Sequence, residues 1–162
     1  MALIKENKKI QRTISGILVL VILVVIFNFS NQNGEDSEGT SKQISNKVIE
    51  ILRLDNGLNE EEKDDLTGKV DHIIRKLAHF SIYTLLGFSL ISFLDTINIR
   101  DKKRIVITIV FGLLYAISDE FHQMFISGRN PSSLDVMIDT LGVIFGVCIF
   151  LLLRKILHSA FH

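Results

Sequence analysis

The sequence YAISDEFHQMFISGRNPSSLDVMIDTLG, from Tyr115 to Gly142, places a polar centre between two runs of apolar residues. Each run is long enough to enter a lipid bilayer. The polar side chains at the centre are Asp119, Glu120, His122, Gln123, Arg129, Asp135 and Asp139. Ionisable groups at membrane depth are costly unless they are paired or hydrated, so by default they mark a functional site. We therefore take this stretch as the centre of both the fold and the candidate site.

Composition limits the class of protein. Hydrophobic residues make up 48% of the 162 residues, charged residues make up 22%, and mean hydropathy is +0.36. This mixture is typical of a small membrane protein with polar connecting segments. The formal net charge is zero and the chain has no Trp. The sequence shows no basic face interleaved with aromatic residues, so it gives no support to a nucleic-acid-binding protein. The single cysteine, Cys148, cannot form an internal disulfide or a cysteine zinc site, and we expect it to pack as a small hydrophobe.

Four apolar segments predict an all-α membrane protein whose transmembrane helices form a bundle. We expect the spans at about residues 14–30, 77–97, 105–124 and 134–153, within one domain covering residues 1–162. A spanning helix needs roughly 20 apolar residues, and about 17 at the short end. The first segment follows a basic stretch, as in a signal peptide, but no small-residue cleavage pattern comes after it. We therefore expect it to remain as the first span.

An acid-rich, polar segment at about residues 31–74 separates the first two spans. It contains two amphipathic helical patterns, one formed by Ile44, Val48, Ile51 and Leu52, the other by Leu66, Val70, Ile73, Ile74 and Leu77. Asn59 and Glu62 have the spacing of a helix capping box. Because these helices have an apolar side but no core of their own, we expect them to lie on the membrane surface or over the bundle.

Positive charge assigns the orientation. Lys and Arg gather near the N-terminus, in the link after the second span and near the C-terminus, so both termini are expected in the cytoplasm. The segment 31–74 and the link 125–133 then face outward. Every span becomes polar toward its outer end, where the chain carries Ser30, Gln32, Arg75, Lys76, His79, Tyr83, Asp119, Glu120, His122, Gln123, Asp135 and Asp139.

Helical spacing groups these outer side chains by face. Residues three or four apart share a face, which unites Asp119, His122 and Gln123, then Arg75, His79 and Tyr83, and then Asp135, Asp139 and Gly142. Gly142 with Gly146 favours a close contact with another helix. We expect the three faces to converge on one outward-facing polar site.

With these residues in view, the chain resembles the VanZ-like family of bacterial membrane proteins. The resemblance is carried by RKLAHFSIYTLLG (75–87), SDEFHQMFISGR (118–129), SLD (133–135), DTLGVIFG (139–146) and the Ser-x-Gln of residues 30–32. These segments touch all four expected spans. One departure is Asp139, which stands where the family pattern has Asn, and this favours a hydrogen-bonding role there.

The resemblance implies a protein of the bacterial cell membrane and cell envelope. The family is named for an accessory protein of glycopeptide resistance, associated with reduced susceptibility to teicoplanin-type drugs. It implies no particular reaction. The expected partner is a membrane lipid or a lipid-linked envelope precursor, or the glycopeptide antibiotic itself, and nucleic acid is not expected.

The polar residues divide into two sets of candidates. Those with acid–base chemistry are Asp119, Glu120, His122 and His79. Those suited to ligand binding are Arg75, Lys76, Tyr83, Gln123, Arg129, Asp135, Asp139, Ser30 and Gln32. No cofactor is predicted, although His79 and His122 with two carboxylates are ligand types that suit a divalent metal. No compact metal-ligand motif is present.

The sequence leaves several alternatives open. The site can be enzymatic, or it can only bind or shield an envelope molecule or a drug. The polar residues can also form a structural brace between short helices. A proton-coupled transporter is disfavoured because the carboxylates are confined to the outer half. Arg129 can form an anion-binding corner with the N-terminus of the fourth helix, or Asp135 can both cap that helix and pair with Arg129.

Overall fold

The computed structural model describes residues 2–32, 34–129 and 131–160, and the side chains of residues 2–6, 34–38, 40, 158 and 160 lie outside this description. Its elements are the helices α1 (Ala2–Ser30), α2 (Gly34–Leu52), α3 (Glu60–Asp95), α4 (Asp101–Gln123) and α5 (Ser133–Ala160). Four of them, α1, α3, α4 and α5, are long and apolar enough to cross a membrane. This confirms the predicted all-helical class.

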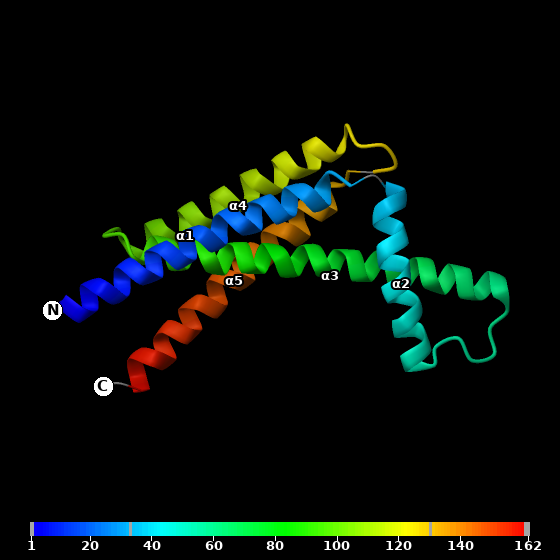
Figure 1. The fold of residues 1–162 in the computed structure, drawn as a ribbon, viewed down its shortest axis with the longest axis horizontal. Coiled ribbons are helices and arrows are strands. Elements are labelled where there is room, and N and C mark those ends of the chain that lie inside the picture. Colours follow the sequence, from blue (N-terminus) through cyan, green and yellow to red (C-terminus); the bar gives the residue numbers. More distant parts are fainter. Residues whose placement is uncertain (1, 33, 130, 161–162) are drawn as a thin grey trace.

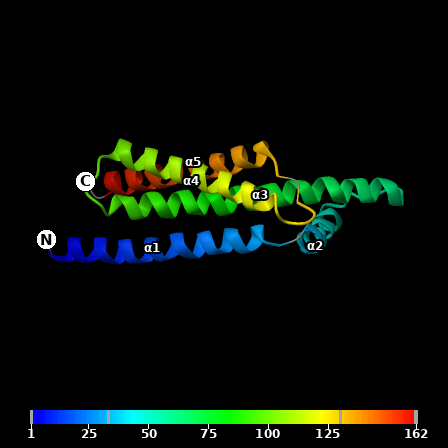
Figure 2. The ribbon, with the colours of Figure 1, turned by 90° about the horizontal axis from the view of Figure 1, so that it is seen from above.

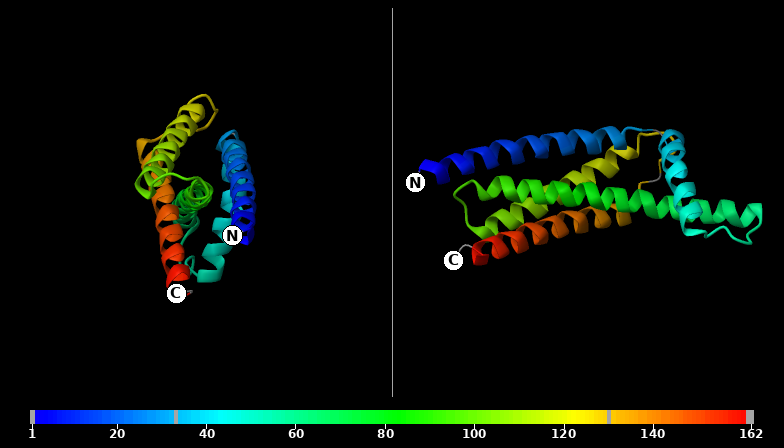
Figure 3. Two further views of the ribbon diagram at one scale, coloured as in Figure 1. Left: turned by 90° about the vertical axis from the view of Figure 1, so that its left-hand side faces the viewer. Right: turned by 60° about the horizontal axis from the view of Figure 1, so that its bottom comes forward.

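The third helix is the centre of the bundle. It packs against each of the other four, and it lies between α1 on one side and α4 and α5 on the other (Figures 2 and 3). Apolar side chains face outward along the long helices, as Leu20, Leu114 and Leu152 do. Long helices that expose apolar residues in this way are typical of a multi-pass membrane protein.

Sequence periodicity places an amphipathic helix before the second span, but the structure joins the two. One uninterrupted helix runs from Glu60 to Asp95, and Asn59 caps it with both hydrogen bonds of the predicted capping box, each 2.9 Å long. Its 36 residues span about 54 Å at about 1.5 Å per residue. A bilayer core is about 30 Å thick. The N-terminal part of α3 therefore projects beyond the bundle, where α2 crosses it (Figure 1).

The buried face of α2 differs from the predicted apolar stripe. Ser41, Ser45 and Ile49 are buried, whereas Ile44 and Ile51 are exposed. Asn46 of α2 accepts a hydrogen bond from the hydroxyl of Thr67 in α3 at 3.3 Å. Small side chains on the inner face allow two helices to approach closely, so two serines join Ile49 on the buried face of α2.

Glycines bring α3 and α5 into close contact, as the spacing of Gly142 and Gly146 predicts. A Cβ atom on Gly142 would lie 2.6 Å from the carbonyl oxygen of Phe80, and one on Gly146 would lie closer still to that of Thr84. Only glycine fits at such a distance. The contact fixes the register of the two helices, which sets His79 of α3 next to Asp139 of α5.

The end of the bundle that holds the start of α1 and the end of α5 is fastened by ion pairs. Arg104 pairs with Asp95 and Asp101, and Arg154 lies 3.2 Å from Asp95. Arg12 of α1 donates to the hydroxyl and carbonyl oxygens of Thr96 at 3.1 and 3.0 Å. We call this the terminal end, and the opposite one the α2 end.

Candidate functional site

A cavity of about 240 Å³ opens at the α2 end, between α3, the α4–α5 loop and the start of α5. Polar residues dominate its lining, which includes His72, Arg75, Lys76, His79, Glu120, Gln123, Arg129, Asp135 and Asp139. Gly128, with φ of 75°, lets the chain turn in the left-handed region just before Arg129. Eight of the predicted site residues, Arg129 among them, therefore line a single cavity together with His72.

Two ion pairs lie at the rim of the cavity. Lys76 donates to the carboxylate of Asp135 at 2.6 Å, which ties α3 to the first turn of α5. Arg75 lies 3.1 Å from Asp71, one turn earlier in α3, and Asp71 is buried. Asp135 therefore pairs with Lys76 rather than with Arg129, the partner considered from the sequence.

The N-terminus of α5 is capped from another helix. Glu120 of α4 accepts a hydrogen bond from the backbone N–H of Ser132 at 2.9 Å. The hydroxyl of Ser132 accepts one from the N–H of Leu134 at 3.2 Å. Since Glu120 holds the α4–α5 loop against the start of α5, it has a structural contact in addition to its place in the cavity wall.

Arg129 reaches across to the end of α1. Its guanidinium donates to the carbonyl oxygens of Phe29 at 3.0 Å and Gln32 at 3.2 Å. Burial lowers the pKa of Arg129 from its ordinary value, and the positive charge of Arg75 lowers it further, while Asp119 and Glu120 act in the opposite direction. An arginine nevertheless keeps its proton in proteins. Two guanidinium groups of like charge therefore line one cavity.

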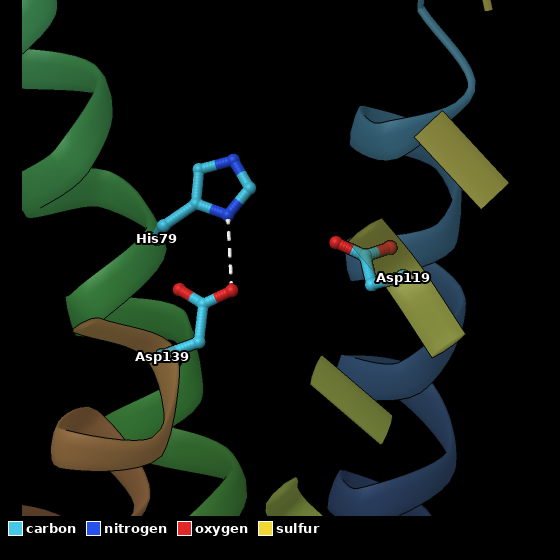
Figure 4. Close-up of side chains that lie close together, drawn as sticks. All are labelled: His79, Asp119 and Asp139. Atoms are coloured by element: carbon cyan, nitrogen blue, oxygen red, sulfur yellow. Dashed lines mark ion pairs between the residues drawn. The ribbon is translucent and has the colours of Figure 1, made fainter. Parts of the chain in front are cut away.

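A buried cluster lies on the inner side of the cavity. His79 of α3, Asp119 of α4 and Asp139 of α5 each contribute one polar atom to a group whose members lie within 4.8 Å of one another (Figure 4). The His79 Nδ1 atom is 3.7 Å from Asp139 Oδ2. Asp119 accepts a hydrogen bond from the Gln123 amide at 3.2 Å. Asp119 is 5% exposed and Asp139 is 0% exposed.

Several polar atoms at this cluster have no hydrogen-bond partner among the described residues. They are Ser30 Oγ, His79 Nδ1, Tyr83 Oη and both carboxylate oxygens of Asp139. The Ser30 hydroxyl lies beside Asp119, and Tyr83 lies near both carboxylates. Buried polar groups are almost always paired in native proteins, so a concentration of unpaired ones calls for an explanation.

Two predicted site residues lie elsewhere. The His122 ring stacks on Phe27 of α1 at a centroid distance of 5.2 Å, and its Nε2 atom is 3.3 Å from Asn31 Oδ1. Gln32 is exposed and contributes its backbone carbonyl, not its side chain, to the bond with Arg129. His122 shares a helix face with Asp119 only loosely, and its ring turns toward α1 instead of the cavity.

Sequence reasoning missed two polar residues near the cavity. His72 lines it, and Asp71 holds Arg75. Both lie one turn before residues that were recognised, since Asp71 and Arg75 are four apart, as are His72 and Lys76. The spacing is therefore visible in the sequence, but Asp71 and His72 fall within the polar segment 31–74, which is expected to lie outside the spans.

The family comparison supplies the identity. The model of the VanZ/LLP1 family matches residues 16–154, which include His79, Asp119 and Asp139. The chain belongs to the VanZ/LLP1 family. No curated protein and no solved structure is significantly similar to it.

The matched region of this VanZ/LLP1 chain includes α3 and α4 and most of the apolar parts of α1 and α5. Its cavity offers guanidinium and ammonium donors, which suit an anion such as a phosphate. The cluster beneath offers an imidazole nitrogen and carboxylate oxygens, which suit a cation. The two kinds of group share one opening, because His79 and Asp139 belong to both.

Proposed function

We propose that this VanZ/LLP1 protein is a bacterial cell-envelope protein that recognises the anionic head group of a membrane lipid or lipid-linked envelope precursor. The head group would occupy the cavity at the α2 end. The observation that carries the proposal is the pair of guanidinium groups, Arg75 and Arg129, on the wall of one cavity.

Arg129 gives the stronger half of that observation. Its bonds are to neutral backbone carbonyls, and within the described part of the chain it forms no ion pair with a carboxylate. Its charge is thus available to a ligand. Arginine is well suited to bind phosphate through two parallel N–H bonds, and a half-buried site strengthens such contacts.

The orientation of the protein follows from the positive-inside rule. Arg12, Arg104 and Arg154 lie at the terminal end, so that end is proposed to face the cytoplasm. The cavity at the opposite end then opens at the outer leaflet, where envelope precursors and glycopeptide drugs meet. Altered susceptibility to teicoplanin-type glycopeptides is the phenotype expected from this placement.

Lipid analysis of the purified protein tests the proposal. We expect one anionic lipid or lipid-linked species to be enriched with the wild-type protein, and Arg129→Ala to reduce that enrichment about tenfold or more, since a charge-assisted hydrogen bond contributes about 1.5–3 kcal/mol. Lys69→Ala, at an exposed position of α3 outside the cavity, is the matched control. Equal lipid content in wild type and Arg129→Ala, with unchanged thermal stability, would contradict the proposal.

The His79, Asp119 and Asp139 cluster favours an enzymatic form of the same function, because groups able to transfer protons adjoin the cavity. Mass spectrometry of envelopes containing the wild-type or the Asp119→Asn protein separates the forms. An accumulating lipid species in the variant indicates turnover. If the lipids are unchanged and the glycopeptide-susceptibility phenotype is lost only in Arg129→Ala, the protein binds its ligand without turnover. If all variants are less abundant in the membrane, the polar residues form a structural brace between the helices.

A further inference from the structure

The buried cluster of His79, Asp119 and Asp139 has a composition that anion binding does not explain. Each residue comes from a different helix, and their polar atoms lie within 4.8 Å of one another. We propose that this cluster is a binding site for one divalent transition-metal ion, of which Zn²⁺ is the representative. The proposal goes beyond the recognition of an envelope molecule and does not depend on it.

The first argument is charge. Asp139 is fully buried and neither of its oxygens has a hydrogen-bond partner among the described residues, while Asp119 accepts a hydrogen bond from Gln123. Of the nearby cations, Lys76 pairs with Asp135 and Arg75 pairs with Asp71. Arg129 donates to the backbone carbonyls of Phe29 and Gln32 and forms no ion pair with Asp139 among the described residues. Carboxylates buried without compensation are costly, and a bound cation supplies the compensation.

The terminal end shows how the same chain neutralises carboxylates without a metal. There Asp95 and Asp101 are each paired with Arg104, and Arg154 lies within 3.2–3.4 Å of both. The cluster at the α2 end is more deeply buried, yet it has an imidazole in place of arginines. A histidine placed beside two carboxylates matches a metal-ligand set better than an ion-pair network.

The second argument is geometry. Catalytic zinc sites have three protein ligands and an open position, and tetrahedral bonds of about 2.0 Å separate the ligand atoms by about 3.3 Å. The three atoms here are within 4.8 Å, so modest side-chain rotations would bring them onto one ion. Figure 4 shows the His79 and Asp139 groups directed toward each other, with Asp119 facing them across the gap.

The third argument is the set of unpaired hydroxyls. Tyr83 Oη and Ser30 Oγ are buried beside the carboxylates and have no hydrogen-bond partner within the described residues. Hydroxyls in this place can orient metal-bound carboxylates, as groups outside the ligand sphere do in metal sites. His79 and Asp139 also line the cavity, so a further ligand can approach the ion from that side.

Metal content measured on the full-length protein in detergent tests the proposal. The protein is stripped with EDTA, equilibrated with Zn²⁺ and freed of unbound metal. We expect about one Zn²⁺ per chain for wild type and for Asp64→Asn, an exposed carboxylate on α3. Asp139→Asn, which preserves side-chain volume, should weaken binding by more than about 100-fold, since even groups outside the ligand sphere contribute about 10–100-fold.

Thermal melting gives a second readout, because the difference in melting temperature between Asp139→Asn and wild type should depend on whether Zn²⁺ is present. In EDTA, Asp139→Asn should melt at a higher temperature than wild type, because it removes an uncompensated buried charge. With Zn²⁺, wild type should gain stability and Asp139→Asn should not. Wild type that retains no Zn²⁺, or equal retention by wild type and Asp139→Asn, would overturn the proposal. Arg129→Ala should retain Zn²⁺, so failure of metal binding is distinguishable from failure of anion binding.

Discussion

At the scale of single residues, equal geometry does not mean equal contribution to stability. Lys76 and Asp135 lie 2.6 Å apart with side chains 26% and 31% exposed, and they join two helices. Lys69 and Asp65 are also 2.6 Å apart, but their side chains are 70% and 66% exposed and they belong to one helix. The less hydrated pair is screened less by water and salt.

A double-mutant cycle measures this difference. Lys76→Met and Asp135→Asn, singly and together, should give a coupling energy of about 1 kcal/mol, the upper end for partly exposed pairs. The Lys69 and Asp65 pair should give about 0.3–0.5 kcal/mol, the usual value for an exposed pair one helical turn apart. Unfolding in mixed detergent micelles supplies the free energies, and equal coupling in both cycles would contradict the argument.

The candidate residues show what sequence can predict about a site. Spacing on each helix grouped Arg75, His79 and Tyr83, and the structure brings His79 to Asp139 because glycines set the α3–α5 register. The spacing could not predict how α4 is rotated about its axis, and this rotation turns His122 toward Phe27 of α1. Residues on one helical face span a wide arc, and only packing against neighbours decides which of them reaches the centre.

At the scale of the elements, the close approach of α3 and α5 is the contact on which the site depends. Gly142 lies against the Phe80 carbonyl, and Gly87 of α3 lies against the backbone of Val143. Small residues at helix crossings are how membrane helices pack closely. The sequence predicted this contact from the spacing of its glycines. The sequence did not predict that α3 is continuous from Glu60. Its pattern changes from an amphipathic stripe to a fully apolar run at the expected membrane boundary, but the helix continues across that boundary.

Glycine-to-alanine substitutions test that contact. Gly146→Ala should lower the free energy of unfolding by about 1–3 kcal/mol, the usual cost of overpacking, because the added methyl group meets the Thr84 carbonyl. Gly68 lies in the part of α3 that projects beyond the bundle, and no atom of another element lies within 4 Å of a methyl group added there by Gly68→Ala. It should raise the free energy by up to about 1 kcal/mol through helix propensity. Similar effects of both substitutions would show that the helices are not in close contact.

At the scale of the whole molecule, the two ends of the bundle have different roles. The terminal end is closed by arginine–aspartate pairs, whereas the α2 end is open to a polar cavity. The sequence predicted this asymmetry from the distribution of basic and polar residues along the spans. The sequence could not predict which face of α2 is buried, since Ser41 and Ser45 lie on that face with Ile49 and carry no amphipathic signal.

Cysteine labelling in intact cells tests the proposed orientation. In a Cys148→Ser background, Gly68→Cys on the projecting part of α3 should react with a membrane-impermeant maleimide added outside. Lys103→Cys, at an exposed position of the terminal end, should react only after permeabilisation, because clustered basic residues stay in the cytoplasm. The reverse labelling pattern would place the cavity at the inner leaflet and exclude outer-leaflet recognition.

The most direct test of the central claim, that Arg75 and Arg129 form an anion site, is a titration of the purified protein followed by native mass spectrometry. Phosphatidic acid, with its phosphate head group, is compared with neutral diacylglycerol of the same chains. Wild type should bind phosphatidic acid in preference, and Arg129→Ala should lose about tenfold or more of that affinity while its affinity for diacylglycerol is unchanged. Equal binding of the two lipids by wild type, or equal binding of phosphatidic acid by wild type and Arg129→Ala, would contradict the account.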